Sequence, residues 1–546
     1  MSEIRIVVAI DFGTTYSGFA YAHRSKQNQI TAHSDWQEYK GRFKTPTVLK
    51  YDESFKLTSW GVPALAEKPN KKKKTPDVKP VERFKLHLGQ MKDKPHLPDK
   101  LDYKTAITDY LREMGQVIKN TLNTTWQKID FFKQVLIIMT IPAEFDNQAM
   151  TIMRECAYDA GIINEKGSKN LKFTTEPEAA AVYCLKKRKE YNIDVGSSFM
   201  IVDCGGGTVD LTTRKLREDD KLDETTEREG DFCGGSFVDE EFLKFIGEKV
   251  GESALKQVKE KHYSQLQYMV QDFCRRVKIP FNGESKNFQP PEMDLKKLCP
   301  ILQQYVKGSK LDEMEEIEWI VELTYDDVKA MFDPVIERII NLIRKQLDKS
   351  NDDISAILLV GGFSESKYLL KRVKQEFNDK VPTISVPTQP IIAVVKGAVQ
   401  YGLEQEIVKT RVLKWTYGTD VAKKWQKGDP PHRRRSDGRI IKFTTLAKRG
   451  EQVPVDKKIV RNYAAPSATQ KILGLDIYVT KKDNATYCNE PGVELLDSWN
   501  IKIPEENKSK ENRSFSFTLT FGSVEIEATA QSKSGEKFEN SFELDI

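Results

Sequence analysis

Apolar runs of strand length alternate with helical patterns over residues 1–402 of the chain. The longest runs are Ile4–Ile10, Val135–Met139 and Ala356–Val360, and helical patterns lie at Asn147–Ala160 and Pro177–Lys187, the second with a proline at its first position. Strands that alternate with helices predict mixed α/β lobes. No apolar run reaches the ~18–20 residues of a membrane-spanning helix, so we expect no membrane partner.

Two segments of this region repeat one pattern. Ile4–Ala22 and Ser198–Leu216 each contain an apolar strand, an aspartate, a turn rich in Gly and Thr, and a second strand. The aspartates are Asp11 and Asp203, and their wide separation indicates that the repeat unit is a whole lobe. We therefore predict two lobes, at about residues 1–195 and 196–402.

A third apolar strand, Ile354–Val360, runs directly into the pair Gly361–Gly362. Bare backbone at these glycines suits a close approach to a nucleoside. Ser364 has the residue type of a helix N-cap and predicts a helix over Glu365–Phe377.

The pattern changes after residue 403. From Ile440 onward only short period-two runs occur, most clearly Phe515–Phe521 and Val524–Ala530, which flank Gly522–Ser523 in the manner of a type II′ hairpin. We predict an antiparallel β-sandwich at residues 412–546 and a linker at residues 403–411.

Composition describes a soluble globular chain, with 39% hydrophobic and 31% charged residues among 546. A net charge of +5 over this length gives no case for a nucleic-acid partner. The N-terminus lacks the features of a secretory signal, so we expect a cytoplasmic monomer, with the nucleus as the alternative compartment. The cysteines show no CxxC spacing and predict reduced thiols: Cys156, Cys184, Cys204, Cys233, Cys274, Cys299 and Cys488.

The two Asp-turn segments predict a site for a polyphosphate, because consecutive backbone N–H groups in such turns suit phosphate oxygens. The carboxylates of Asp11 and Asp203 would repel phosphates unless a hard cation lay between them, and Mg²⁺ held mostly through water is the simplest choice. One such turn is more often structural, but two matched copies favour a clamp. The turns supply hydroxyl groups at Thr14, Thr15 and Thr208, and close backbone approach at Gly13, Gly205, Gly206 and Gly207.

Several motifs resemble the actin/Hsp70/sugar-kinase superfamily. DFGTTYSG, DCGGGTVD and LLVGGFSES resemble its two phosphate loops and its adenosine segment, and MTIPAEF and TTEPEAAAVYCL its connecting strand and Glu-Pro helix. FTTLAKRGEQVPV, LDIYV and FTLTFGSVEIEATAQSKSG are similar to the Hsp70 peptide-binding β-domain, and TTEPEAAAVY, GGFSES and the missing lid resemble the divergent family-twelve group. The resemblance implies a two-lobed actin-like (ribonuclease H-like) ATPase domain followed by a β-sandwich.

The resemblance also implies roles for individual residues. Asp11 and Asp203 would orient hydrated Mg²⁺, and Glu176 would hold a metal-bound water. Lys85, in VERFKLHLG, is the candidate catalytic lysine that stabilises phosphoryl transfer, and its alternative is a solvated helix lysine. Thr14 and Thr15 would bind the β and γ phosphates, Thr208 and Asp210 would lie near the γ-phosphate, Gly235 near phosphate or ribose, and Gly361 and Gly362 under the nucleoside.

A second group, in QDFCRRVKIPF, falls where the family binds ribose and adenine. It comprises Asp272, Arg275 and Lys278, and the alternative interpretation is an exposed amphipathic helix end.

Three features depart from the family pattern. Glu365 stands where an arginine commonly stacks on adenine, and a carboxylate cannot make that contact. In the family, an arginine eight residues after a proline couples nucleotide state to the β-domain. Here the proline is Pro142 and the position is Met150, with Arg154 one helical turn later. The linker LEQEIVKTRVLKW lacks the usual acidic, Leu-rich sequence. The departures bear on allostery more than on nucleotide binding.

We expect an Hsp70-like ATPase that binds ATP or ADP with Mg²⁺, hydrolyses ATP slowly and contacts unfolded or extended polypeptide, together with co-chaperones. Without a lid, peptide binding should be weak and fast-exchanging. One alternative is a nucleotide-sensing scaffold with little hydrolysis. A small-molecule kinase is the third option, for which no acceptor motif is present.

Overall fold

Parallel pairing organises the first sheet of the computed structural model. Strand β1 (Ile6–Asp11) pairs in parallel with β10 (Val135–Ile141), and β10 pairs in parallel with β11 (Leu171–Thr175). On its other side β1 pairs with β2 (Tyr16–His23) in antiparallel fashion, and β3 (Thr31–Ala32) forms the edge. β1 and β10 are buried at every residue, which explains their continuous apolar sequences.

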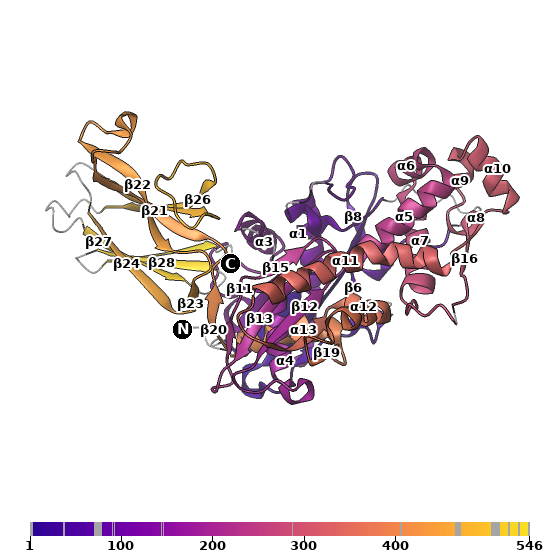
Figure 1. Ribbon diagram of the computed structural model, residues 1–546, viewed down its shortest axis with the longest axis horizontal. Coiled ribbons are helices and arrows are strands. Elements are labelled where there is room, and N and C mark those ends of the chain that lie inside the picture. Colours follow the sequence, from indigo (N-terminus) through magenta and orange to yellow (C-terminus); the bar gives the residue numbers. More distant parts are fainter. Residues whose placement is uncertain are drawn as a thin grey trace. The chain divides into compact units, whose positions relative to one another are not determined.

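Two helices pack together against this sheet. Helices α4 (Glu176–Leu185) and α13 (Ala393–Leu403) lie side by side (Figure 1). Helix α13 also contacts β1 and β10. Gly397 permits their close approach, because a Cβ there would lie 1.7 Å from the carbonyl oxygen of Ala179. The sequence predicts that this helix begins at Pro177, whereas α4 begins one residue earlier, at Glu176, with Thr175 as its N-cap.

The second sheet repeats the arrangement. Strand β12 (Ser198–Cys204) pairs in parallel with β18 (Ile354–Val360), and β18 with β19 (Thr383–Ser385). Strand β13 (Val209–Leu216) lies on the other side of β12 and pairs with β15 (Glu229–Asp231). An aspartate therefore ends the first strand in one sheet and stands one residue from the end in the other, as the repeat predicts.

The helix after β18 starts later than the sequence predicts. Gly362–Glu365 forms a 3₁₀ turn, and α12 (Lys367–Phe377) begins after Ser366, whose hydroxyl caps it by accepting a hydrogen bond from Leu369. The predicted N-cap at Ser364 is wrong, because its hydroxyl group donates to the carbonyl oxygen of Val360 at 2.5 Å.

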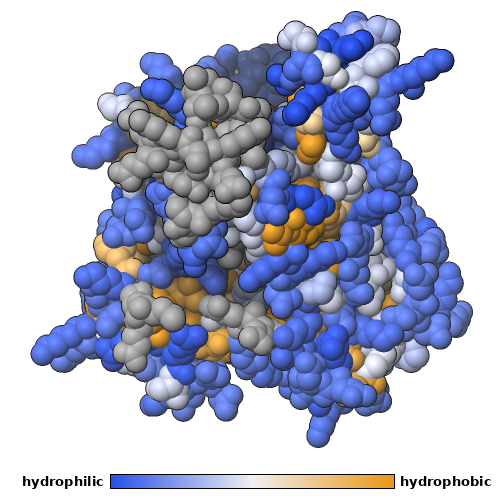
Figure 2. Space-filling model, turned by 90° about the vertical axis from the view of Figure 1, so that its left-hand side faces the viewer, coloured by the Kyte–Doolittle hydropathy of each residue, from blue (hydrophilic) through white to orange (hydrophobic). Residues whose placement is uncertain are grey.

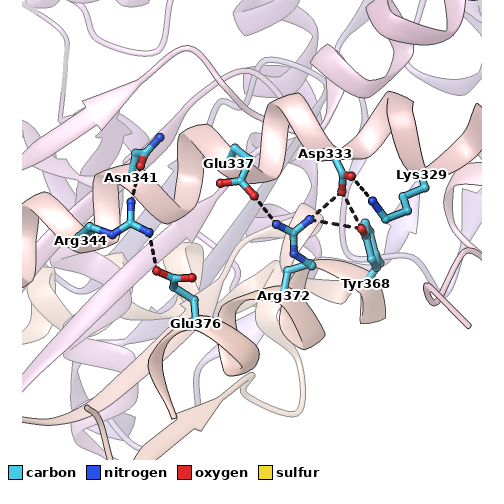
Figure 3. Close-up of polar contacts among 8 residues, drawn as sticks. All are labelled: Lys329, Asp333, Glu337, Asn341, Arg344, Tyr368, Arg372 and Glu376. Carbon is cyan, nitrogen blue, oxygen red and sulfur yellow. Dashed lines mark hydrogen bonds and ion pairs between the residues drawn. The ribbon is translucent and has the colours of Figure 1, made fainter. Parts of the chain in front are cut away.

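A polar network fastens α12 to the long helix α11 (Tyr325–Lys349) (Figure 3). Asp333 accepts hydrogen bonds from Lys329, Tyr368 and Arg372 at 2.5, 2.6 and 2.7 Å. Arg372 also contacts Glu337, and Arg344 contacts Glu376 further along. The network therefore holds α11 and α12 together.

Smaller elements complete these two lobes. A three-stranded sheet stands beside the first sheet, and a group of helices follows the second. They comprise β6 (Thr45–Pro46), β7 (Val48–Tyr51), β8 (Leu57–Trp60), β9 (Lys79–Glu82), α1 (Tyr103–Thr125), α3 (Asn147–Asp159), α5 (Ser236–Val250), α6 (Glu252–Lys261), α7 (Tyr263–Phe273), β16 (Glu292–Asp294), α8 (Leu295–Leu298), α9 (Leu302–Tyr305), α10 (Ser309–Glu316) and β17 (Ile320–Glu322).

Two four-stranded antiparallel sheets form most of the C-terminal part. Their orders are β22-β21-β25-β26 and β24-β27-β28-β29, and their apolar faces share one core that includes Ile477 and Phe517. The runs of period two form β27 and β28, while the predicted turn at Gly522–Ser523 lies outside the described residues. The strands are β21 (Thr416–Lys424), β22 (Arg439–Ala447), β24 (Lys457–Ala464), β25 (Ile472–Thr480), β26 (Val493–Lys502), β27 (Ser514–Phe521), β28 (Glu525–Ser532) and β29 (Lys537–Glu543).

The chain divides into two compact units. The first contains residues 1–145, 152–213 and 229–405, and the second contains 146–151, 214–228 and 406–546. In the second unit β20 (Val408–Val412) pairs with β14 (Leu222–Glu224) and β23 (Gln452–Pro454). The domain limits 1–402, 403–411 and 412–546 stay predictions.

The structure describes all residues except 1–3, 37–38, 70–78, 90, 92, 144, 146, 287, 405–406, 465–470, 504–513, 522–524, 533–535 and 544–546. Within the described ranges, every helix is too short or too polar to cross a membrane. All seven cysteines are free thiols.

Candidate nucleotide site

The turn after β1 is held by its own hydrogen bonds. The amide of Gly13 donates to the hydroxyl group of Ser17 at 3.1 Å, and the hydroxyl group of Thr47 donates to the carbonyl oxygen of Gly13 at 2.8 Å. A Cβ at Gly13 would lie 2.2 Å from the carbonyl oxygen of Tyr16, so the turn needs glycine. The backbone amides of Thr14 and Thr15 have no acceptor among the described residues.

The turn after β12 has its carbonyl groups occupied. The amides of the Gly234–Ser236 turn donate to the carbonyl oxygens of Gly205, Gly206 and Gly207 at distances from 2.8 to 3.1 Å. The amides of Gly206, Gly207 and Thr208 have no acceptor in the described part of the chain. The turn therefore presents unpaired N–H donors, while the carbonyl groups of Gly205, Gly206 and Gly207 are all engaged.

The two turns lie against each other. A Cβ at Gly206 would lie 2.1 Å from Thr15 Oγ1, and one at Gly207 would lie 2.5 Å from Thr14 Oγ1. Five unpaired amide groups from two sheets thus meet at one place. Such a cluster of backbone donors has the chemistry that suits an anion with several oxygens.

Buried carboxylates surround the turns. Asp11, Asp203 and Glu176 are each at most 9% exposed. Burial raises the pKa of Asp203 well above its ordinary value, and the charges of Glu176, Asp210 and Asp11 raise it further. This crowding costs free energy unless cations offset it, which fits a site for Mg²⁺. The described residues hold no group of three or more His, Cys, Asp or Glu side chains placed to bind a metal directly.

Lys85 supplies one of the cations. It lies on a 3₁₀ turn (Phe84–Leu88), is 2% exposed, and donates to Glu176 Oε1 at 2.8 Å. The interpretation of Lys85 as a solvated helix lysine is therefore wrong. Burial raises the pKa of Glu176, and Lys85 opposes that rise.

Lys44 supplies the other cation, and no sequence motif predicts it. Its Nζ lies 2.6 Å from Asp11 Oδ2, and its side chain is 12% exposed. Burial lowers the pKa of Lys44, but Asp11, Asp203 and Glu176 outweigh burial and raise it above the ordinary value. Asp11 thus forms an ion pair with Lys44, whereas the sequence predicts that it orients hydrated Mg²⁺.

The remaining phosphate-side residues have distinct surroundings. Asp210 Oδ1 accepts a hydrogen bond from the amide of Ala143 at 2.8 Å, which joins the second sheet to the end of β10. Gly235 leaves room for Phe363, whose ring would lie 3.1 Å from a Cβ at Gly235.

The glycines after β18 differ from each other. Gly361 has φ +83°, and a Cβ there would lie 2.3 Å from Asp203 Oδ1. Gly362 is exposed, and a Cβ there would have no heavy atom within 4 Å. Gly361 thus makes room for Asp203, while Gly362 borders open space.

The predicted ribose and adenine residues are engaged within the protein. Asp272, at 5% exposure, accepts hydrogen bonds from Arg275 at 2.7 Å and from Arg276 at 3.2 Å. Lys278 pairs with Asp239 at 2.7 Å. These residues lie at the end of α7 and on the π-helical turn after it (Cys274–Lys278), and their part in nucleotide binding stays a prediction.

The departures from the family pattern have structural counterparts. Phe363 packs in the core beside Phe332, and Glu365 is exposed. Met150 is 1% exposed. Arg154 lies over the ring of Phe173 and donates to the carbonyl oxygens of Ser168 and Leu171, so it is engaged beside β11.

Comparisons with known proteins find relatives over nearly the whole chain. A family model described as a domain of unknown function (DUF8340) matches residues 194–386. The chain is 25% identical to heat shock 70 kDa protein 12A of Mus musculus and 23% identical to protein 12B of Homo sapiens, over 96% and 97% of its own length and 89% of each relative. It is also 23% identical to the chaperone protein DnaK of Metamycoplasma hominis, over 66% of the chain and 59% of that protein. Over nearly its whole length the chain is therefore similar to Hsp70-like proteins of the family-twelve group.

Proposed function

We propose that the chain binds ATP or ADP with Mg²⁺ at the two turns and hydrolyses ATP slowly to ADP and phosphate. The observation that carries the proposal is the cluster of five unpaired amides, at Thr14, Thr15 and Gly206–Thr208, beside buried carboxylates. The likeness to Hsp70 proteins over nearly the whole chain supports it.

Different groups of the chain carry out the separate tasks of phosphate binding, charge stabilisation and water orientation. The amides bind the terminal phosphates, and Lys85 stabilises the charge that develops during transfer. Glu176 and Asp203, whose pKa values are raised, orient a water for attack. Mg²⁺, when bound, supplies the charge that allows phosphates to lie beside Asp203 and Glu176.

Calorimetry with ADP and ATP in Mg²⁺ tests binding, and single-turnover hydrolysis tests chemistry. Asp203→Asn should abolish hydrolysis in folded protein, while Asp194→Asn, a change at an exposed position, should retain it. A folded wild-type protein that takes up neither nucleotide would contradict the proposal.

We also propose that the second unit contacts extended polypeptide. The edges of its sheets are β22, β26, β24 and β29, and an extended segment can add to a sheet edge through backbone hydrogen bonds. Figure 2 shows one mostly polar face of the molecule with a few apolar patches. Among the second unit's own apolar side chains, those of Val460, Ile472 and Leu495 are about half exposed. Fluorescence anisotropy with a labelled unfolded peptide tests the contact, and no binding at high micromolar protein would contradict it.

A nucleotide-sensing scaffold is the second candidate. Arg154 is held beside β11, and Glu365 cannot stack as a cation on adenine, which favours binding without coupled hydrolysis. Tight ADP binding together with hydrolysis that is equal in wild type and Asp203→Asn would favour the scaffold.

A further inference from the structure

Lys44 is built into the first phosphate turn by strand pairing. It directly precedes β6, which pairs with the start of β2 through the partners Ser17 and Thr45. The next residues are tied to the turn, because Thr47 bonds both Gly13 and Ser17. Lys44 therefore moves with the turn and does not sample solvent like a surface lysine.

Gly18 opens the path by which Lys44 reaches Asp11. Asp11 and Gly18 are cross-strand partners in β1 and β2, so their side-chain positions lie on the same face. A Cβ at Gly18 would lie 3.1 Å from Lys44 Cγ and 2.7 Å from the carbonyl oxygen of Phe43. The missing side chain at Gly18 is the space through which the lysine stem passes.

The ammonium group has donors to spare. It carries three N–H bonds, and Asp11 is its one ion-pair partner within the described residues. The charges that act on it come from Asp11 on β1, Asp203 on β12 and Glu176 on α4. A buried ammonium with unfilled donors, paired with the aspartate that directly precedes the first turn, favours a further anionic partner.

We propose that Lys44 is a resident cation of the phosphate site, which neutralises Asp11 and donates to an oxygen of the terminal phosphates of the nucleotide. The inference rests on the proposed nucleotide binding and adds a residue to it. Lys44 then supplies part of the positive charge that the phosphates need, so phosphate binding depends less on divalent metal.

Nucleotide affinity in the presence and absence of metal tests the inference in the wild-type protein. Calorimetry with ADP should show retained binding in EDTA, within about 100-fold of the affinity in Mg²⁺. Loss of more than about 1,000-fold in EDTA would overturn the inference, while absence of binding in Mg²⁺ as well would instead contradict nucleotide binding itself.

Lys44→Met removes the ammonium group and keeps the apolar stem. A hydrogen bond to a charged group contributes about 10- to 100-fold in affinity, so ADP binding in EDTA should weaken by that factor and adenosine binding should not change. The matched control is Lys40→Met, which removes the same charge from an exposed side chain four residues earlier and should leave both affinities unchanged.

Unchanged ADP affinity in folded Lys44→Met, or an equal loss for adenosine, would overturn the inference. If Lys44→Met does not fold, Gly18→Ala tests the same contact, because its Cβ displaces the lysine stem and keeps both charges. ADP affinity in EDTA should then fall by about 10-fold or more, and a wild-type affinity in folded Gly18→Ala would overturn the inference.

Discussion

Lys85 Nζ lies 2.8 Å from Glu176 Oε1, and the two side chains are 2% and 11% exposed. The pair joins the 3₁₀ turn Phe84–Leu88 to the first residue of α4. Three residues before Lys85, Glu82 at the end of β9 accepts a hydrogen bond from Tyr263 of the second lobe at 2.6 Å. The residue proposed for chemistry is therefore also part of how the first lobe is held together.

Lys85→Met should destabilise the protein as well as stop hydrolysis. Removing one partner leaves Glu176 buried without its cation, which costs about 3–5 kcal/mol. The free energy of unfolding in urea measures the loss, and single-turnover hydrolysis should fall at least about 100-fold. The double variant Lys85→Met/Glu176→Gln should regain stability but no activity. A single variant as stable as wild type would show that the pair contributes little.

Gly361→Ala and Gly362→Ala separate folding from nucleoside binding. Gly361 has φ +83° and crowds Asp203, so alanine there should cost about 1–3 kcal/mol of stability. Gly362 has open space, so alanine there should leave the melting temperature unchanged and weaken ADP binding if the nucleoside passes over it. Thermal melts and calorimetry measure both effects. Unweakened ADP binding in Gly362→Ala would place the nucleoside elsewhere.

Glu224→Gln should destabilise the second unit strongly. Glu224 is fully buried, accepts from Arg228 at 2.7 Å and from the amide of Val412 at 2.9 Å, and pairs with Arg214 at 3.2 Å. The substitution leaves buried arginine charges without their carboxylate, at a cost of about 3–5 kcal/mol. Chemical denaturation followed by fluorescence measures the loss.

Glu227→Gln is the control for that prediction. Glu227 pairs with Arg449 at 3.0 Å where the side chains are 21% and 36% exposed, so its loss should cost at most about 1 kcal/mol. An equal loss of unfolding free energy for Glu224→Gln and Glu227→Gln would show that burial does not decide how much an ion pair contributes.

Asp333 makes stability depend on acidity. Partial burial raises its pKa, but the hydrogen bonds from Lys329 and Tyr368 and the charge of Arg372 outweigh burial and hold the pKa below the ordinary 3.8. A depressed carboxylate pKa stabilises the folded state above the ordinary value, and the stabilisation is lost as pH falls through the folded pKa.

Asp333→Asn should therefore cost about 1–2 kcal/mol near pH 7 and less below pH about 3.8. Urea unfolding of both proteins from pH 7 to pH 3 measures the difference. The difference should shrink toward the acid end, and a constant difference across this range would contradict the ionic origin of the effect. Glu376→Gln, at a more exposed pair with Arg344, should change stability by at most about 1 kcal/mol.

Local sequence predicted the two phosphate turns and the strands that carry them. The third strand, Ile354–Val360, has the predicted limits, whereas the helix after it begins at Lys367 and not at Glu365. The error arose because Ser364 and Ser366 are equally suited to capping, and only the 3₁₀ turn at Gly362–Glu365 decides between them. Cap choice depends on backbone angles that residue type leaves open.

The amino-acid sequence by itself determined the two Gly/Thr turns that we propose for phosphate binding, because a strand, an aspartate and the turn lie within one short segment. It also predicted that the cysteines are free thiols, and that the sheets before and after residue 403 differ in kind. Only the tertiary structure decided which charges meet there. Lys44 reaches Asp11 through the pairing of β6 with β2, and Lys85 reaches Glu176 from a separate turn. Lys44 has no periodic or motif signal, and Lys85 is singled out only through the resemblance of VERFKLHLG. Sequence does not predict either ion pair, because the partner of a buried charge is set by distant segments that the fold brings together.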